Sequence, residues 1–284
     1  MVRHRPPAVA GQFYEADPEA LKRRIGWCFK HPLGPGRLPK PSAERVRESK
    51  AFMVPHAGYI FSGPVAAHAY LRIAEEGMPE TFVIMGPNHT GLGSPVAVYP
   101  DGVWETPLGE VPVDADLAAE ILRNSRFARA DVSAHESEHS IEVQLPFLQF
   151  IFGNNFAIVP IAMLYQTPKV AEDLASAIVK AVDALGRDVT VIASSDMSHY
   201  EPHEVAVRKD RMALERILKL DPDGLYNVVL DRNITMCGVG PVMTAIRASL
   251  AWGASSAELL KYATSGDVTG ERSWVVGYAA VRIR

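Results

Sequence analysis

The chain has 284 residues, of which 48% are hydrophobic and 22% are charged, and this is the composition of an ordinary folded protein. A chain of this length buries about three quarters of its unfolded surface, so it needs no disulfide framework, and its two cysteines exclude one. The net charge of −4 argues against a dominant electrostatic attraction to nucleic acid or to an anionic membrane, so neither partner is expected.

The chain also lacks the sequence marks of membrane insertion or secretion. Its apolar runs are all shorter than the roughly 18 residues that a membrane-spanning helix needs. The basic stretch at residues 1–7 is not followed by the apolar segment of a secretory signal. We therefore expect a cytoplasmic protein.

Helical stretches alternate with short apolar runs along the chain. The helices are predicted at residues 18–31, 64–76, 115–124, 141–152, 168–185, 205–220 and 241–252. Five apolar runs, at residues 51–55, 81–86, 156–162, 189–193 and 274–281, lack polar alternation, which is typical of strands covered on both faces. Residues 99–113 predict a hairpin with its turn at Pro100-Asp101-Gly102.

This alternation predicts an α/β fold in which helices cover a mixed, largely parallel central sheet in a three-layer α/β/α sandwich. No long linker interrupts the pattern, so residues 1–284 are expected to form a single domain.

Three histidines follow predicted strands closely. His56 comes after the run at 51–55, His89 after 81–86, and His199 after 189–193 within Ser194-Ser195-Asp196-Met197-Ser198-His199. In open α/β sheets, ligands bind in the crevice beyond the carboxyl ends of the strands. We expect at least two of these histidines to share a site, where imidazole can bind a metal or transfer protons. Alternatively, they only cap strands through bonds to loop carbonyls.

The two cysteines have different surroundings. Cys237 precedes a predicted helix, and a helix N-terminus lowers the pKa of a thiol, so Cys237 is a candidate nucleophile or soft metal ligand. The alternative is a buried cysteine that acts as a small hydrophobic residue. Cys28 fits that alternative better, because it lies on an apolar helix face.

The segment His135-Glu136-Ser137-Glu138-His139 matches the H-E-x-x-H pattern of zinc proteases. That pattern works only inside a helix, where both histidines share one face. Here the context favours a loop that opens the helix at 141–152, with Glu138, His139 and Glu142 near a site.

Several of these motifs together resemble the Memo family. The matching stretches are 10–14 (AGQFY), 55–59 (PHAGY), 86–89 (GPNH), 138–142 (EHSIE), 194–199 (SSDMSH) and 237–238 (CG), and they extend over nearly the whole chain. The resemblance implies a fold similar to that of the class III extradiol ring-cleaving dioxygenases, which are non-haem iron enzymes. It also implies a metal pocket formed by His56, His89 and Cys237.

Further pocket residues follow from the same resemblance. It assigns Asp196, His199 and His139 to the pocket as catalytic residues, with His199 at the place of the dioxygenases' acid/base histidine. The dioxygenases bind iron through two histidines and a carboxylate, whereas Cys237 would supply a softer thiolate that suits copper, zinc or a differently tuned iron.

Three functions remain open at this point. The first is a metal-dependent redox protein that uses iron or copper, in which Asp196 orients His199 for proton transfer. The second is a non-catalytic module that binds a peptide or small molecule in the same pocket. The third is a zinc-dependent hydrolase, because two histidines and one cysteine also occur as a catalytic zinc ligand set.

Overall fold

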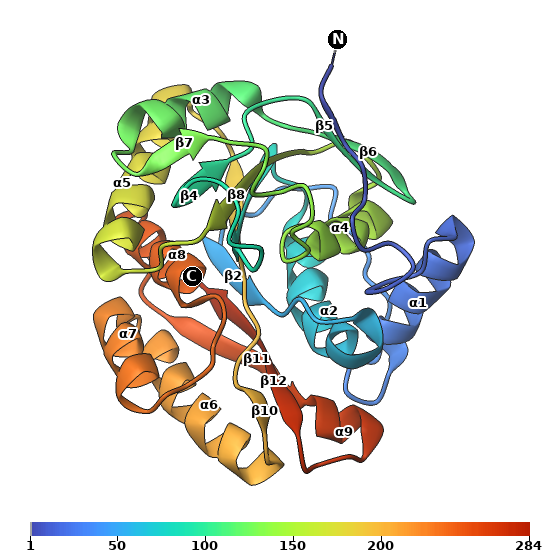
Figure 1. Cartoon of the computed structure of the whole chain (residues 1–284). Coiled ribbons are helices and arrows are strands. Elements are labelled where there is room, and N and C mark those ends of the chain that lie inside the picture. The colour runs from blue at the N-terminus through green and yellow to red at the C-terminus, as the bar shows by residue number, and fades with distance from the viewer. Residues whose placement is uncertain (1) are drawn as a thin grey trace.

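A nine-stranded mixed sheet lies between two layers of helices in the computed structural model, which describes residues 2–284 (Figure 1). The strands of the sheet run in the order β10-β12-β2-β9-β3-β8-β4-β7. Strand β11 lies outside this order and pairs with β12 on the edge opposite to β2, since both strands pair with residues 281–283. Their bounds are β2 Ala51–Val54, β3 Thr81–Pro87, β4 Val96–Val98, β7 Ala128–Ala130, β8 Ala157–Met163, β9 Val189–Ser194, β10 His199–Glu201, β11 Ala257–Thr264 and β12 Val275–Ile283.

The four central strands β2, β9, β3 and β8 are parallel to one another. Met53 of β2 and Met85 of β3 both stand opposite Ala193 of β9, so the carboxyl ends of the three strands lie side by side. The loops that follow these strands therefore begin at one edge of the sheet. This edge carries the residues described below.

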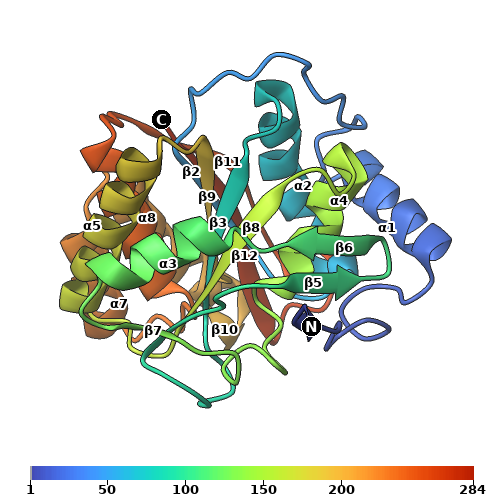
Figure 2. The ribbon, with the colours of Figure 1, turned by 90° about the horizontal axis from the view of Figure 1, so that it is seen from above.

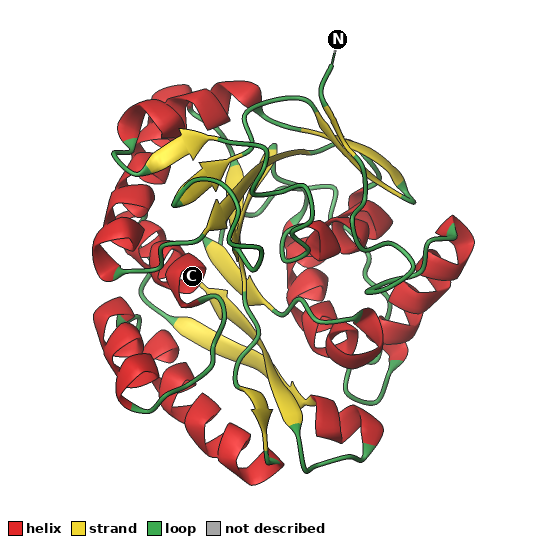
Figure 3. Cartoon of the chain, viewed as in Figure 1, coloured by secondary structure: helices red, strands yellow, loops and turns green. Residues whose placement is uncertain are grey.

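The helices cover both faces of the sheet, as the view from above shows (Figure 2), and Figure 3 separates them from the strands by colour. Helices α1 (Pro18–Lys30), α2 (Tyr59–Glu76) and α4 (Leu145–Phe152, preceded by the 3₁₀ turn η1 at Glu142–Gln144) lie on one side. On the other side lie α3 (Ala115–Asn124), α5 (Pro168–Leu185), α7 (Pro222–Asp231) and α8 (Val239–Ala251). Helix α6 (His203–Leu218) belongs to the same side, because its buried side chains join the core under these helices. A short helix, α9 (Ser265–Thr269), joins β11 to β12.

Side-chain alternation along the strands divides the apolar interior into two cores. Phe82 and Ile84 of β3 belong to the core under α1, α2 and α4, whereas Val83 and Met85 belong to the core under α3, α5 and α8. All four side chains are fully buried. Because successive residues of a strand point to opposite faces, a continuous apolar run supplies both cores at once.

The predicted three-layer α/β fold with a mixed, largely parallel sheet is confirmed. All five predicted strands form, and the helices over 115–124 and 168–185 have the predicted bounds. Helix α1 begins as expected, since the Asp17 side chain accepts the Ala20 N–H at 2.7 Å. Helix α2 starts at Tyr59 rather than at Pro64, so this proline lies inside the helix. None of the helices in the described part of the chain has the length and apolarity needed to span a bilayer.

The predicted hairpin also forms, but with a different turn. Strands β5 (Val103–Thr106) and β6 (Gly109–Pro112) pair around Pro107 and Leu108, and Pro100-Asp101-Gly102 lies before the hairpin. The hairpin joins β1 (His4–Arg5) in a separate three-stranded sheet, which brings the N-terminal segment against the middle of the chain.

Candidate metal centre

Three predicted site residues follow the central parallel strands directly. His56 follows β2, His89 follows β3, and Asp196 follows β9. The rings of His56 and His89 lie 5.3 Å apart between centroids, so two of the strand-end histidines do meet at one site, as predicted. Their side chains differ in exposure, since 1% of His56 and 34% of His89 is accessible to solvent.

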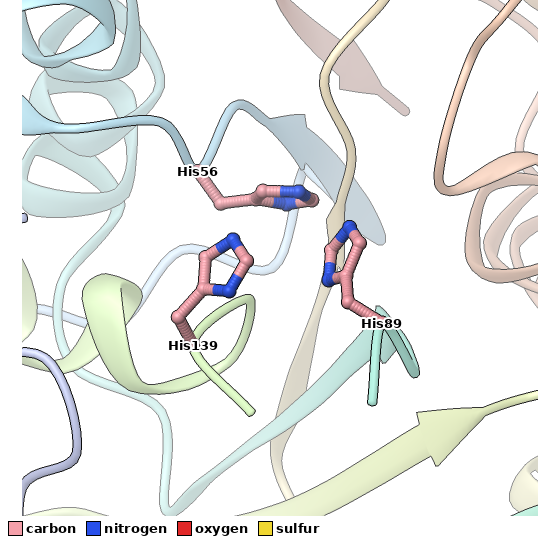
Figure 4. Close-up of side chains that lie close together, drawn as sticks. All are labelled: His56, His89 and His139. Atoms are coloured by element: carbon pink, nitrogen blue, oxygen red, sulfur yellow. The ribbon is translucent and has the colours of Figure 1, made fainter. Parts of the chain in front are cut away.

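His139 completes a group of three imidazoles (Figure 4). It comes from the loop before η1, and its ring lies 4.7 Å from that of His89 and 5.4 Å from that of His56. One ring nitrogen of each histidine lies within 4.8 Å of those of the other two. The resemblance assigned His139 a catalytic role, and the structure places its ring in a group of three histidines that could hold a metal ion.

Hydrogen bonds determine which nitrogen of His56 carries the proton. Its Nδ1 lies 2.8 Å from Ser194 Oγ, which donates its single hydrogen to the Ser140 carbonyl at 2.6 Å. Ser194 Oγ must therefore accept from His56 Nδ1. The proton resides on Nδ1, and Nε2 presents a lone pair to the other ring nitrogens. Burial, followed by the charges of His139 and His89, holds the pKa of His56 well below its usual value, so the ring is neutral.

Glu138 orients His89 in the same way. Its Oε1 lies 2.8 Å from His89 Nδ1, and a carboxylate only accepts, so Nδ1 carries the hydrogen and Nε2 is left for the site. Burial opposes the ionised carboxyl, but the hydrogen bond and charge of His89 outweigh it and lower the pKa of Glu138 to about 2. A carboxylate behind a histidine is a common support of metal-binding imidazoles.

The ring of His139 makes a longer contact with the same carboxylate, 3.6 Å from Nδ1 to Glu138 Oε1. Burial, the largest effect, lowers the pKa of His139 to about 4, which keeps the imidazole neutral. The Phe13 ring packs against it at 4.5 Å between centroids. The backbone N–H of His139 donates to Glu138 Oε1 at 3.0 Å, so one carboxylate holds both His89 and the backbone of His139.

Cys237 lies beside His56, with its Sγ atom 3.3 Å from His56 Nε2. The expectation that a helix N-terminus lowers the pKa of this thiol is wrong. Burial, followed by the negative charge of Asp196, raises the pKa of Cys237 instead. Desolvation of the thiolate exceeds the helix effect here, so Cys237 is a neutral thiol unless a cation replaces its proton.

Asp196 and His199 have partners other than those predicted. Asp196 Oδ1 accepts the backbone N–H of His56 at 2.8 Å, and burial raises the pKa of this carboxyl to about 6. Asp196 does not orient His199, since His199 Nδ1 lies 2.7 Å from the Thr235 carbonyl and must donate to it. Thr235 lies in the loop before α8, and the periodicity of the sequence could not predict that this loop lies next to β10.

The H-E-x-x-H segment does not form a zinc-protease site. Residues 135–139 are not helical, and His135 is fully buried with Nε2 3.0 Å from the Ala97 carbonyl. The Glu142 carboxylate is bound by Arg5 and Tyr14 rather than by a histidine of the cluster. Of the charged and histidine residues in this loop, Glu138 and His139 are the two that reach the site.

The architecture defines an α/β protein with a histidine cluster at the carboxyl edge of its parallel strands. A family described as "Memo-like protein" matches residues 5–282. A MEMO1 family protein of Ignicoccus hospitalis is 56% identical over 278 residues, which are 98% of both chains. A MEMO1 family protein of Methanopyrus kandleri is 53% identical over 280 residues, 99% of both chains. The chain therefore belongs to the Memo family, as its motifs indicated.

The fold also occurs in a protein of very different sequence. The crystal structure of uncharacterized protein JW3007 from Escherichia coli K12 aligns with 84% of this chain and 100% of its own, with a TM-score of 0.56. The two sequences are 11% identical, so the likeness concerns the fold alone.

Proposed function

We propose that this protein binds one redox-active transition-metal ion, iron or copper, at the three-histidine cluster and acts with it on a small organic molecule. The observation that carries the proposal is the mutual approach of three ring nitrogens within 4.8 Å. Two of the rings have Nδ1 engaged by Ser194 and Glu138, which leaves Nε2 to bind the ion. Deprotonated ring nitrogens suit iron, copper and zinc, so at His89, whose pKa Glu138 raises against the effect of burial, the ion would replace a proton.

The third ligand is His139 in this proposal, because its ring nitrogen meets the distance condition together with His56 and His89. Cys237 is the alternative third ligand that the family resemblance suggests. Its sulfur lies 3.3 Å from His56 Nε2, and it would bind as a thiolate. The two ligand sets share His56 and His89, so variants at the remaining two positions distinguish them.

A bound iron or copper ion would supply electron transfer and activation of dioxygen. The chain's own residues would admit the substrate and move protons. His89 and His139 are 34% and 21% exposed, which leaves the ligand cluster open on one side. His199 donates from Nδ1 to Thr235, so its Nε2 can accept a proton near the site.

The test is anaerobic purification followed by elemental analysis of the wild type and of the variants His89→Ala, His139→Ala and Cys237→Ser. About one metal ion per chain is expected, lost in His89→Ala and His139→Ala and retained in Cys237→Ser. His4→Ala is the control, because His4, Glu105 and Glu110 form an exposed group that could also take up metal. Wild type without metal, even after reconstitution with iron, copper or zinc, would refute the proposal.

A zinc hydrolase is the second candidate, and the closeness of Cys237 to His56 favours it. Two histidines and one cysteine form a known catalytic zinc set. Cobalt substitution separates the two sets, because a thiolate ligand adds a sulfur-to-cobalt charge-transfer band that Cys237→Ser would abolish. Zinc in the purified protein, together with this band and with hydrolysis of model esters, would replace the redox proposal. Binding of small molecules in the pocket, with neither bound metal nor turnover, would instead indicate a non-catalytic binding module.

A further inference from the structure

A buried ion pair lies outside the three-histidine cluster and joins the N-terminal segment to the loop that carries His139. Arg5 of β1 is 2% exposed and Glu142 of η1 is fully buried, and the guanidinium Nη1 donates to Glu142 Oε2. The hydrogen bonds and ion pairs that the structure gives these two residues involve none of the three histidine rings. Burial of two charges requires that their remaining hydrogen-bonding groups find partners, and the partners here define a single loop.

Arg5 binds the backbone of that loop at two places. Its Nε and Nη2 donate to the His135 carbonyl at 3.0 and 2.8 Å, and Nη2 also donates to the Glu138 carbonyl at 2.7 Å. Residues 135–139 have neither helix nor strand hydrogen bonding of their own. The planar guanidinium therefore fixes the separation of two carbonyls in a segment that lacks regular structure.

Glu142 binds the N-terminal segment in return. Its carboxylate accepts the backbone N–H groups of Ala8 and Val9 at 2.8 and 3.0 Å and the Tyr14 hydroxyl at 2.6 Å. These three donors belong to residues 8–14, the same segment that places Phe13 against the His139 ring. The segment also reaches the N-terminus of α2, because the Phe13 carbonyl accepts the Tyr59 N–H at 2.8 Å.

We infer that Arg5 and Glu142 are positioning residues of the metal site, which hold the loop of Glu138 and His139 so that His89 and His139 face His56. The inference rests on the proposed function and extends it to a part of the chain that supplies no ligand. The physical reason is that a ligand on an irregular loop needs outer contacts to keep its orientation, and loss of such contacts weakens metal binding.

The experiment compares metal affinity in the full-length variants Arg5→Gln, Arg5→Lys and Glu142→Gln. We expect about a tenfold weaker Kd for cobalt or zinc in Arg5→Gln and Glu142→Gln, and a smaller loss in Arg5→Lys, which keeps the charge. Arg282→Gln is the matched control. Arg282 forms a similar buried pair with Glu76, at 2.7 Å, and hydrogen-bonds Ser49 rather than the site loop.

A second measurement needs no metal. The N–H groups of His139 and Ser140 donate to Glu138 Oε1 in the metal-free chain, so their hydrogen exchange reports on the loop. Faster exchange in Arg5→Lys and Glu142→Gln than in Arg282→Gln supports the inference that these residues hold the loop. A wild type that binds no metal would refute the proposed function but would not affect this result. Unchanged exchange and affinity in the Arg5 and Glu142 variants, or equal losses in Arg282→Gln, would overturn the inference. Should Arg5→Gln fail to fold, the other two variants decide.

Discussion

The Glu138 carboxylate accepts four N–H donors, and the substitution Glu138→Gln removes its charge with little change of shape. Oε1 accepts from His89 Nδ1, the His139 N–H and the Ser140 N–H at 2.8, 3.0 and 2.9 Å, and Oε2 accepts the His89 N–H at 2.5 Å. A glutamine oxygen at the Oε1 position keeps three of these bonds. Its NH₂ group then faces the His89 N–H, so two donors oppose each other.

The expected changes in unfolding free energy and in metal affinity follow from these contacts. Hydrogen bonds to a charged group contribute about 1.5–3 kcal/mol, and a buried donor left without a partner costs about 1–3 kcal/mol. Loss of one such bond and weakening of the other three predicts a fall of about 3 kcal/mol in the unfolding free energy of the metal-free protein. The metal Kd should rise about 10- to 100-fold, which corresponds to about 1.4–2.7 kcal/mol, since an uncharged amide oxygen holds the His89 ring less firmly than a carboxylate and the His89 backbone N–H loses its acceptor.

Isothermal titration with zinc or cobalt measures the affinity, and urea unfolding measures the stability. Glu136→Gln is the matched control, because Glu136 lies in the same loop but is exposed, so the same chemical change should leave both quantities within experimental error. An affinity in Glu138→Gln equal to that of Glu136→Gln would show that His89 needs no carboxylate to bind metal, and the reasoning about its orientation would fail.

Three further predictions concern stability. The pKa of Glu138 is about 2 in the folded chain, below its ordinary value of 4.5. The ionised carboxylate therefore contributes about 3 kcal/mol to the unfolding free energy above pH 4.5, and this contribution is lost as the pH falls to 2. Acid unfolding of the metal-free wild type should show this loss, and Glu138→Gln should lack it. Gly63→Ala should destabilise the protein by about 1–3 kcal/mol, because the new Cβ overlaps Cys28 Sγ. In urea unfolding, the double variant with Cys28→Ala should recover most of the lost stability, and a double variant that recovers none of it would contradict the steric cause. Tyr200 has φ 55° and is 70% exposed, so Tyr200→Asn should raise the unfolding free energy by about 1 kcal/mol, and a decrease would show that the ring makes a stabilising contact.

The part of the site built on parallel strands could be predicted from the sequence. Each apolar run is long enough to fix a buried strand, and parallel strands end at a common edge, so His56 and His89 had to begin their loops close together. Because each of these histidines follows the end of its strand within a few residues, its position could vary little. The same argument named His199 after β9, whereas Asp196, which the family resemblance alone assigned to the pocket, lies at this edge and holds the backbone of His56.

The loop residues could not be predicted in this way. The loop of Glu138 and His139 contacts Arg5 and Phe13, and these two contacts join segments more than 120 residues apart in the chain. His199 is oriented by a carbonyl from residue Thr235 rather than by its near neighbour Asp196. Strand β11 was missed for a related reason. Its sequence AELLKYAT favours helix by propensity, and its pairing with β12 from Ala257 to Thr264 overrides that preference.

Two glycines connect the short sequence motifs to the geometry of the site. A Cβ at Gly86 would overlap Ser140 Oγ, so the end of β3 can approach the Glu138–Ser140 loop only where the side chain is absent. A Cβ at Gly238 would likewise meet the Ser194 carbonyl and the Ser195 side chain. The first contact brings Glu138 within reach of His89, and the second brings Cys237 within reach of His56. The motifs GPNH and CG each combine a residue of the site with a glycine that allows two segments to approach closely.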